Sequence, residues 1–441
     1  MPRRTLKPKL APGRVERAYK YRLYPTREQI DAIEDQMSYG CWLYNSALQQ
    51  RREAYKLGKI LFYNDQSAEL TAAKKAGIFP EDMNAWTLQK VLWRLDRAYG
   101  ETIARLERGE KTGFPRYKTG WKFRTLEWTF QGKAGGARLV HPGYQWHRGP
   151  WTKAEKAALA ACPPNKLRLF LGGIGAIKVK WHRLFPEGSE LKTCTITRKN
   201  HRYYVRFIIE TDEQPLPKTG RSVGIDVGVR TYIATSDGQI INGTIDAKTK
   251  AASKRKKRKD GAQKRIARAQ RVASRRKPGS ERRRKANLIA YRQMEAVANR
   301  RLDNAHKASR RLVDNYDVIT HENLNLAAMV RIRGGKHTQD AGIGYLLRFL
   351  SYKAASAGRT VTAVDPRNTS RTCNECGHVD GGSRRLDTFR CTSCRYEDHA
   401  DTNAAKNIAR LGASLRGEEQ QSGASVKREA AVATATGGVL A

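Results

Sequence analysis

Apolar and polar residues alternate over residues 19–26 (YKYRLYPT), and Pro25 then interrupts the pattern, which predicts a β-strand followed by a turn. From residue 27 to about residue 57 the apolar spacing becomes helical. A second helix is clearer, because apolar residues recur at steps of three and four from Leu88 to Leu106. The chain therefore opens with one strand and two helices.

Short β-branched or alternating runs separated by turns occupy residues 117–211, namely KFRTLEWTF, AIKVKWHRL, TCTITRK and YYVRFIIE. Such a series is typical of a small β-barrel or a curled sheet. We expect this sheet to include the first strand at Tyr19. The helices of residues 27–110 would then be an insertion within one barrel.

A second series of elements begins at Arg221. The runs SVGIDVGV and TYIATSDG predict two strands, and Gly238 predicts a hairpin turn into QIINGTI. Residues 250–311 are compatible with long helices, and VDNYDVITHENLNL predicts the next strand and its exit loop. A helix over residues 340–358 and the strand RTVTAVDP follow. After Leu411 the chain is rich in Ala, Gly, Ser and Gln, and we expect it to be disordered.

The balance of charge points to a polyanionic partner. Among 441 residues, 85 are Lys or Arg and 42 are Asp or Glu, which gives a formal net charge of +43. A compact chain with this charge repels itself, and a bound polyanion would relieve the repulsion. The 18 Tyr and eight Trp offer faces on which nucleic-acid bases can stack. Composition therefore favours a nucleic-acid-binding protein over a merely soluble basic one.

A membrane partner is disfavoured. No apolar run approaches the roughly 18 residues needed to span a bilayer, and no segment has the clean apolar face of a membrane-surface helix. The basic N-terminus, MPRRTLKPKLAPGR, lacks the apolar core of a secretory signal. The seven cysteines do not form a disulfide-framework pattern. We therefore expect a cytosolic protein.

The densest run of positive charge lies in residues 250–286, where 18 Lys or Arg residues accompany only Asp260 and Glu281. Blocks of like charge are usually disordered tails. This block lies between two predicted strands of one domain, which favours a track for nucleic acid instead. The residues that we expect to contact phosphates are Lys254, Arg255, Lys256, Lys257, Arg258, Arg275 and Arg276.

The strongest chemical signal is a pair of Cys-x-x-Cys units separated by 14 residues, formed by Cys373, Cys376, Cys391 and Cys394. Each unit can present two thiolates from a tight turn, and two such turns can close a tetrahedron around zinc. Four sulfur ligands leave no open coordination position, so such a site is structural. A labile redox pair is the alternative. The nearby His378 and His399 are surplus to four cysteines and are interpreted as non-ligands.

Three carboxylates stand at informative places. Asp226 lies inside an apolar strand, which is costly for an unpaired charge, Glu322 ends the strand YDVITHE, and Asp401 precedes the helical run NAAKNIAR. Alone, Asp401 is most simply a helix N-cap. Together, the three fit a ribonuclease-H-like sheet, in which these elements are neighbours. Their carboxylates would then hold two divalent ions about 4 Å apart for in-line attack on a phosphodiester, and magnesium suits such ligands.

Several of these segments resemble one known family. GIDVGVRTYIATSDG, ITHENLNL and NTSRTCNECG…FRCTSCRYEDHADTNAAKNI look like the three split RuvC motifs and the zinc ribbon of the TnpB family of transposon-encoded nucleases. Miniature type V CRISPR effectors share this pattern. The similarity covers residues 221–410, and RLYPT, FYNDQSAELTAAKK and GFPRYK resemble the family's N-terminal half. By these motifs Asp226, Glu322 and Asp401 are the three RuvC acids, whereas the nearby Asp398 is not.

The resemblance also implies a multidomain α+β and α/β architecture. A wedge β-barrel is interrupted by a helical recognition domain, and a RuvC domain of the ribonuclease-H-like class is interrupted by a zinc ribbon. The implied segments are the wedge barrel (1–26 and 116–215), the recognition insertion (27–115), the RuvC domain with its basic helices (216–369), the zinc ribbon that binds target nucleic acid (370–396), the last RuvC helix (397–412) and a disordered tail (413–441).

The function implied by the resemblance is RNA-guided cleavage of double-stranded DNA. Such an enzyme reads a short flanking motif, unwinds the DNA onto a guide RNA and leaves sequence recognition to base pairing. By position, Tyr63 and Gln89 are candidates for reading that motif, while the neighbouring Asn84 and Trp86 could equally be structural. We expect one structural zinc, two catalytic magnesium ions, and a monomer with one guide RNA in the prokaryotic cytosol.

Two other functions stay open on the same fold. A non-catalytic nucleic-acid-binding regulator would be expected to lack one of the three acids, and none is missing. A transposase could use the same acids to join strands, although the sequence contains no separate domain for binding terminal repeats. The motifs do not separate a transposon-encoded enzyme from a CRISPR effector, because both carry them.

Overall fold

The computed structural model describes residues 13–81, 83–130, 136–144, 152–213, 215–228, 231–241, 250–326, 328 and 342–435. Within these ranges the side chains of residues 155, 250–260 and 418–435 are not described. The chain forms two compact units, Met1–Asp212 and Glu213–Ala441. Each unit has its own hydrophobic core.

The first unit is built on a seven-stranded antiparallel sheet with the order β2-β6-β7-β1-β5-β4-β3. A bridge between Thr129 and Gly136 joins the ends of the two edge strands, so the sheet curls on itself. As predicted, the first strand completes this sheet, because β1 pairs with both β7 and β5. The strands are β1 (Arg14–Tyr24), β2 (Thr125–Thr129), β3 (Ala137–Val140), β4 (Arg168–Leu171), β5 (Gly175–Lys180), β6 (Glu190–Lys199) and β7 (Arg202–Asp212).

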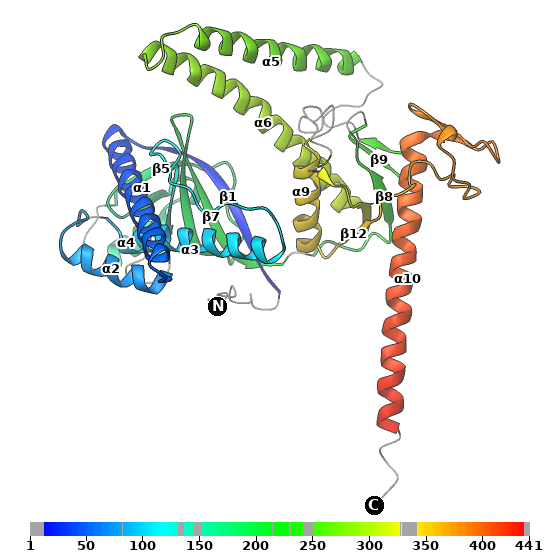
Figure 1. Ribbon diagram of the computed structural model, residues 1–441, viewed down its shortest axis with the longest axis horizontal. Coiled ribbons are helices and arrows are strands. Elements are labelled where there is room, and N and C mark those ends of the chain that lie inside the picture. The colour runs from blue at the N-terminus through cyan, green and yellow to red at the C-terminus, as the bar shows by residue number, and fades with distance from the viewer. Residues whose placement is uncertain are drawn as a thin grey trace, which may run out of the picture. The chain divides into compact units, whose positions relative to one another are not determined.

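Helices α1 (Arg27–Lys56) and α3 (Ala85–Glu107) agree with the two predicted helices and lie beside the sheet (Figure 1). Their buried apolar residues belong to the same core as those of the sheet. Thr26 starts α1 through a capping box with Gln29, in which each side chain bonds the other's backbone N–H. The sequence analysis missed α2 (Tyr63–Lys75) and α4 (Lys153–Ala161). Helix α2 buries few residues, so its apolar periodicity is weak.

The second unit contains a five-stranded sheet with the order β10-β9-β8-β11-β12. Strands β8, β11 and β12 are parallel, whereas β9 and β10 turn back antiparallel through Gly238, whose φ of 81° favours glycine. Because β8 and β11 are parallel neighbours, their last residues lie at the same edge of the sheet. The strands are β8 (Ser222–Asp226), β9 (Ile233–Thr235), β10 (Ile240–Ile241), β11 (Val318–Glu322) and β12 (Thr360–Val364).

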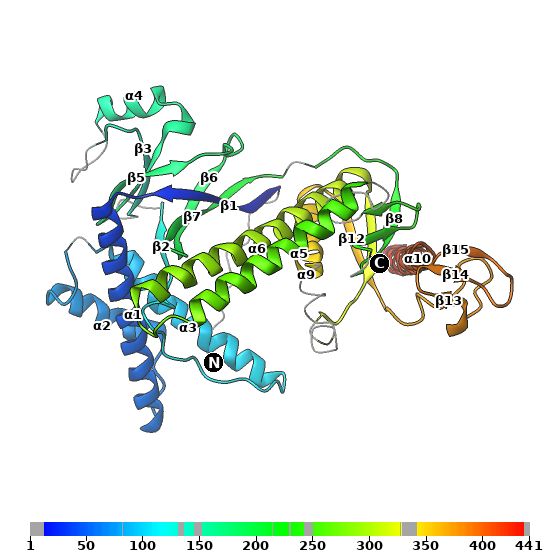
Figure 2. The ribbon, with the colours of Figure 1, turned by 90° about the horizontal axis from the view of Figure 1, so that it is seen from above.

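The basic segment forms two long helices, α5 (Lys250–Ser274) and α6 (Glu281–Asn315), which lie side by side as a hairpin in both views (Figures 1 and 2). Helix α6 packs against α9 (Ile343–Ser356), and Leu312 and Phe349 from these two helices enter the core beside the sheet. The helical interpretation of this region is therefore confirmed. None of the helices in the described ranges is both long and apolar enough to cross a membrane.

The last helix, α10, packs against β8 and β11 (Figure 1) and is longer than predicted. A disordered tail was expected from residue 413, whereas α10 spans Ala400–Ala435. This stretch is rich in Ala, Glu, Gln and Arg, which are favourable in helices, and it contains no proline. The helix therefore runs past the expected boundary at residue 412, while residues 436–441 of the expected tail lie outside the described residues, and disorder of the tail stays a prediction.

Two glycines allow the close approach of α10 to the sheet. A Cβ on Gly224 of β8 would lie 2.2 Å from the backbone oxygen of Ala405 and 2.5 Å from the backbone nitrogen of Ala409. A Cβ on Gly412 would lie 2.3 Å from Oγ1 of Thr320 in β11. Strand and helix backbones therefore touch directly, which any larger residue at position 224 would prevent.

Gly224→Ala should destabilise the second unit by about 1–3 kcal/mol or more, because neither contacting backbone atom can move without displacing α10. Gly417→Ala is the control, since Gly417 lies in the same helix with open space around its Cα and should gain up to about 1 kcal/mol in helix propensity. Denaturant unfolding of both variants measures the difference. Equal stabilities for the two would contradict the close packing of α10 on β8.

Candidate active site and metal centre

The structure brings the four predicted cysteines together. Their sulfur atoms all lie within 4.8 Å of one another, with 3.7 Å between Cys373 and Cys394 and 3.6 Å between Cys376 and Cys391. In the described part of the chain, this is the one compact group of three or more potential metal ligands of the His, Cys, Asp or Glu type. Hydrogen bonding by the backbone N–H of Cys394 lowers the pKa of Cys391, whereas the pKa values of Cys373 and Cys394 are raised, as expected for neighbouring thiols that titrate together.

The two nearby histidines take part in local hydrogen bonds. The backbone oxygen of His378 accepts a bond of 2.8 Å from the N–H of Cys373 within the first cysteine turn. His399 precedes α10, and its Nδ1 accepts a bond of 3.3 Å from the N–H of Asp401. His399 is therefore the side chain that caps the helix. The alternative in which Asp401 serves only as an N-cap is not what the structure shows.

The cysteine cluster sits on a small three-stranded sheet of order β13-β14-β15, next to the start of α10 (Figure 2). Strand β15 leads directly into that helix. The elements are a short 3₁₀ turn (Gly381–Ser383), β13 (Arg384–Arg385), β14 (Thr388–Arg390) and β15 (Glu397–His399).

The three predicted acids come from three elements of the second unit. Asp226 ends β8, Glu322 ends the neighbouring β11, and Asp401 lies in the first turn of α10. Burial, together with the charges of Glu322 and Asp401, raises the pKa of Asp226 to about 7. Burial also raises the pKa of Glu322. Asp226 therefore interacts electrostatically with both other carboxylates, although the three are not as compact a group as the four cysteines.

An arginine completes this cluster. Nη2 of Arg384 in β13 lies 2.6 Å from Oδ1 of Asp401, and its charge partly offsets the raised pKa values of Asp226 and Glu322. The sequence analysis missed Arg384. No sequence signal distinguishes it, because it is one of 85 Lys and Arg residues.

Asp398, three residues before Asp401, is engaged elsewhere. Its Oδ2 accepts a bond of 2.8 Å from Nζ of Lys406 and one of 2.9 Å from the hydroxyl of Tyr396. These bonds tie β15 to α10 and neutralise the charge of Asp398 locally. The geometry therefore favours Asp401 over Asp398 as the partner of Asp226.

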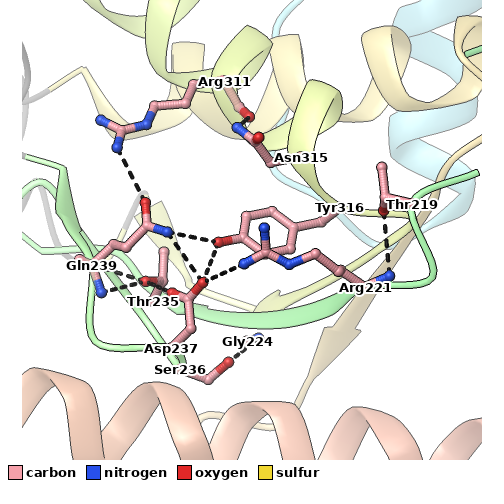
Figure 3. Close-up of polar contacts among 10 residues, drawn as sticks. All are labelled: Thr219, Arg221, Gly224, Thr235, Ser236, Asp237, Gln239, Arg311, Asn315 and Tyr316. Atoms are coloured by element: carbon pink, nitrogen blue, oxygen red, sulfur yellow. Dashed lines mark hydrogen bonds and ion pairs between the residues drawn. The ribbon is translucent and has the colours of Figure 1, made fainter.

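A polar network anchors the opposite end of the strand that carries Asp226 (Figure 3). Asp237, in the turn between β9 and β10, accepts bonds from Arg221 at 3.0 Å and from the hydroxyl of Tyr316 at the end of α6. The Arg221 guanidinium also lies 4.8 Å from the centre of the Tyr316 ring. Ser236 accepts a bond of 3.1 Å from the N–H of Gly224 in β8. The strand is thus fixed to its hairpin and to α6.

The candidate readers of the flanking motif belong to helices of the first unit, whereas the three acids belong to the second unit. Tyr63 begins α2 and Gln89 lies near the start of α3, and both are half-buried in the first unit. Asn84 is the N-cap of α3 and accepts a bond of 3.3 Å from the N–H of Thr87, in line with a structural role. Trp86 is 45% exposed.

The predicted phosphate contacts lie in and just after α5. Arg275 and Arg276 follow the end of α5 and are exposed. The remaining five belong to α5, but their side chains lie outside those that the structure describes: Lys254, Arg255, Lys256, Lys257 and Arg258.

Comparison with known proteins identifies the family. Residues 15–59 match a helix-turn-helix domain, residues 205–333 match a probable transposase, and residues 344–408 match the TNB domain of Cas12f1-like proteins. The chain is also 31% identical to a candidate RNA-guided DNA endonuclease of Streptomyces pristinaespiralis, over 96% of this chain and 98% of that protein. The chain belongs to the TnpB family.

Other similarities of this TnpB-family chain are more distant or shorter. A candidate RNA-guided DNA endonuclease of Escherichia coli K12, InsQ, is 26% identical over 93% of this chain and 96% of that protein. The CRISPR-associated endodeoxyribonuclease Cas12f1 of Sulfoacidibacillus thermotolerans is 36% identical over 26% of this chain and 28% of that protein. Among solved structures, CasPhi-2 bound to crRNA aligns with a TM-score of 0.45 and 11% identity, over 90% of this chain and 98% of that chain.

The raised pKa of Asp226 makes the stability of this TnpB-family protein depend on pH. The folded protein, with a pKa of about 7 against 3.8 for the ordinary group, holds a proton that the unfolded chain releases. The stability from that proton is complete below about pH 4 and is lost as the pH rises through 7. Between about pH 5 and pH 8, the free energy of unfolding of Asp226→Asn should therefore rise relative to that of wild type by on the order of 1–2 kcal/mol. Thermal melts without added divalent cations measure this difference.

Asp398→Asn is the matched control. Although burial raises the pKa of Asp398, hydrogen bonds from Lys406 and Tyr396 lower it overall. The contribution of the Asp398 carboxylate to the free energy of unfolding is therefore complete above about pH 4. The difference in that free energy between Asp398→Asn and wild type should stay constant between about pH 5 and pH 8. An equally constant difference for Asp226→Asn would show that the carboxylates do not cluster.

Proposed function

We propose that this chain is an RNA-guided DNA endonuclease that hydrolyses phosphodiester bonds with Asp226, Glu322 and Asp401. The observation that carries the proposal is the meeting of these three acids at one edge of the second sheet, in a chain of the family whose motifs predict them. The full-length similarity to a candidate RNA-guided DNA endonuclease supports the same activity.

The sheet order β10-β9-β8-β11-β12 supports a ribonuclease-H-like RuvC domain. In this interpretation the first acid ends the central strand, the second ends the parallel strand beside it, and the third is carried by the helix packed on both strands. The curled seven-stranded sheet would be the wedge domain, α1 to α3 its recognition insertion, and residues 370–396 a zinc ribbon that contacts target nucleic acid.

The residues present fit the metals that this function needs. The four thiols of the cysteine cluster suit a structural zinc ion, since they would fill its tetrahedral shell. Asp226, Glu322 and Asp401 offer oxygen ligands of the kind that magnesium prefers. When bound, two magnesium ions would activate water and stabilise the charge that develops on the phosphate.

The chain's own residues would prepare the site for these ions. Asp226 and Glu322 are held by neighbouring strands, so the sheet fixes the spacing of their backbones. The pKa of Asp226 near 7 means that a divalent cation would compete with a proton for this carboxylate. Arg384 beside Asp401 could hold a phosphate oxygen of the DNA, because a guanidinium binds phosphate in a bidentate manner.

Guide RNA and target DNA are polyanions that would suit the net charge of +43. The α5–α6 hairpin exposes Arg275 and Arg276 at its turn, which suits contacts with phosphates. We retain Tyr63 and Gln89 as candidate readers of the flanking motif. A monomer with one RNA in the prokaryotic cytosol is the simplest form of such an enzyme.

Strand transfer is the second candidate, because residues 205–333 match a model described as a probable transposase. The same acids could direct a DNA 3′-hydroxyl instead of water.

Purification of the protein from cells with its native locus, followed by sequencing of the bound RNA, tests the guided activity. One dominant RNA that copies the flank of a mobile element supports a transposon-encoded enzyme, and repeat–spacer RNAs support a CRISPR effector. Random cellular RNA would contradict guided cleavage.

Asp401→Asn should lower the cleavage rate of a matched DNA target by at least about 100-fold, because a ligand of the ions is lost. RNA binding should be unchanged, because the substitution leaves the basic residues of the α5–α6 hairpin intact. Asp398→Asn should stay within about tenfold of wild type, because Asp398 pairs with Lys406 instead. Single-turnover cleavage assays measure both. The opposite order of the two variants would assign the third acid to Asp398.

Cys391→Ser should remove the bound zinc and lower cleavage by at least about tenfold even though Asp401 is intact, because the cysteine cluster fixes where α10 begins. Ser393→Ala, an exposed change in the same turn, is the control and should keep zinc and activity. Zinc content and cleavage are measured on the same preparations. Full activity after complete loss of zinc would refute the coupling.

A further inference from the structure

A buried threonine contacts the second acid. Thr369 lies between β12 and the first cysteine turn and is 2% exposed. Its hydroxyl donates to Oε1 of Glu322 and also lies 3.0 Å from the backbone oxygen of Pro366. Thr369 plays no part in the ligand set predicted from the sequence.

The last helix holds Thr369 in place. Nδ2 of Asn407 in α10 donates to the backbone oxygen of Thr369 at 2.9 Å and to that of Thr372 at 2.7 Å. Asn407 is 3% exposed, so water does not compete for these bonds. The amide therefore fixes the backbone from which the Thr369 hydroxyl points at Glu322.

A second buried amide secures the same segment nearer the cysteines. Nδ2 of Asn403 donates to the backbone oxygen of Thr372 at 2.8 Å, and its Oδ1 accepts from the N–H of Asn374 at 3.0 Å. Asn374 directly follows Cys373. Residues 369–374 thus run from the contact with Glu322 to the cysteine cluster and are held along their length by α10.

We propose that Thr369 is a positioning residue for Glu322 and that α10, through Asn407 and Thr369, orients the second acid as well as carrying the third. A carboxylate offers about four acceptor sites on two oxygens, so a hydroxyl on Oε1 leaves Oε2 free to face a cation. Carboxylates that bind metals are commonly oriented by hydrogen bonds of this kind. The inference rests on the proposed function, in which Glu322 binds a divalent ion.

The test compares Thr369→Val, which keeps the shape and loses the hydroxyl, with Thr369→Ser, which keeps the hydroxyl. Thr372→Val is the matched control, because the Thr372 hydroxyl donates at 2.8 Å to the backbone oxygen of Asn368, a contact outside the acid cluster. Mn²⁺ binding to the protein–RNA complex without DNA is followed by electron paramagnetic resonance of the free ion. Binding to the RNA is subtracted with the Glu322→Gln complex.

We expect Thr369→Val to weaken Mn²⁺ binding by about 10–100-fold, with Thr369→Ser and Thr372→Val close to wild type. In cleavage assays, Thr369→Val should raise the Mg²⁺ concentration for half-maximal rate by a similar factor, while the rate at saturating Mg²⁺ recovers. A general loss of structure would lower that rate and leave the midpoint unchanged. If Thr369→Val gives too little folded protein, Thr369→Ala removes the hydroxyl without the risk of overpacking.

Unchanged Mn²⁺ binding by Thr369→Val, or equal losses in Thr369→Val and Thr372→Val, would overturn the inference. Failure of the proposed function looks different. A wild-type complex that binds Mn²⁺ but does not cut DNA would contradict the nuclease, and the binding comparison of the Thr369 variants would still decide the role of the hydroxyl.

Discussion

The backbone contact between α10 and the second sheet is the constraint on which the acid cluster depends. Where Gly224 and Gly412 lie against their neighbours, no Cβ fits between helix and strands. This approach brings the helix that carries Asp401 onto the strand that ends at Asp226 and the strand that ends at Glu322. Three residues that are far apart in the chain therefore act on one another, because a glycine contact fixes the distance between their backbones.

Electrostatics explain why such a cluster needs a rigid support. Burial raises the pKa values of Asp226 and Glu322, and the charges of Glu322 and Asp401 raise that of Asp226 further. Arg384 offsets this repulsion only in part. A loosely held site would relieve the repulsion by moving apart. The parallel pairing of β8 with β11 and the packing of α10 on both strands hold the three carboxylates near one another.

The cysteine-bearing sheet is an integral part of this arrangement. It supplies Arg384 to Asp401, and the segment before it supplies Thr369 to Glu322. Two buried amides of α10 bind that segment in return. The region around the cysteine cluster is thus joined to two acids by separate contacts, one through Arg384 of β13 and one through the backbone of residues 369–374.

The sequence by itself determined the features that depend on neighbouring residues. Periodicity located β1, α1, α3 and most strands, the Cys-x-x-Cys spacing located the four clustered thiols, and the motifs named the three acids that the structure brings together. Only the tertiary structure decided that Asp398 pairs with Lys406 and that Arg384 pairs with Asp401. The physical reason is that helix and strand periods are written in neighbouring residues, whereas ion pairs and buried hydrogen bonds join residues that only the packing of distant elements brings together.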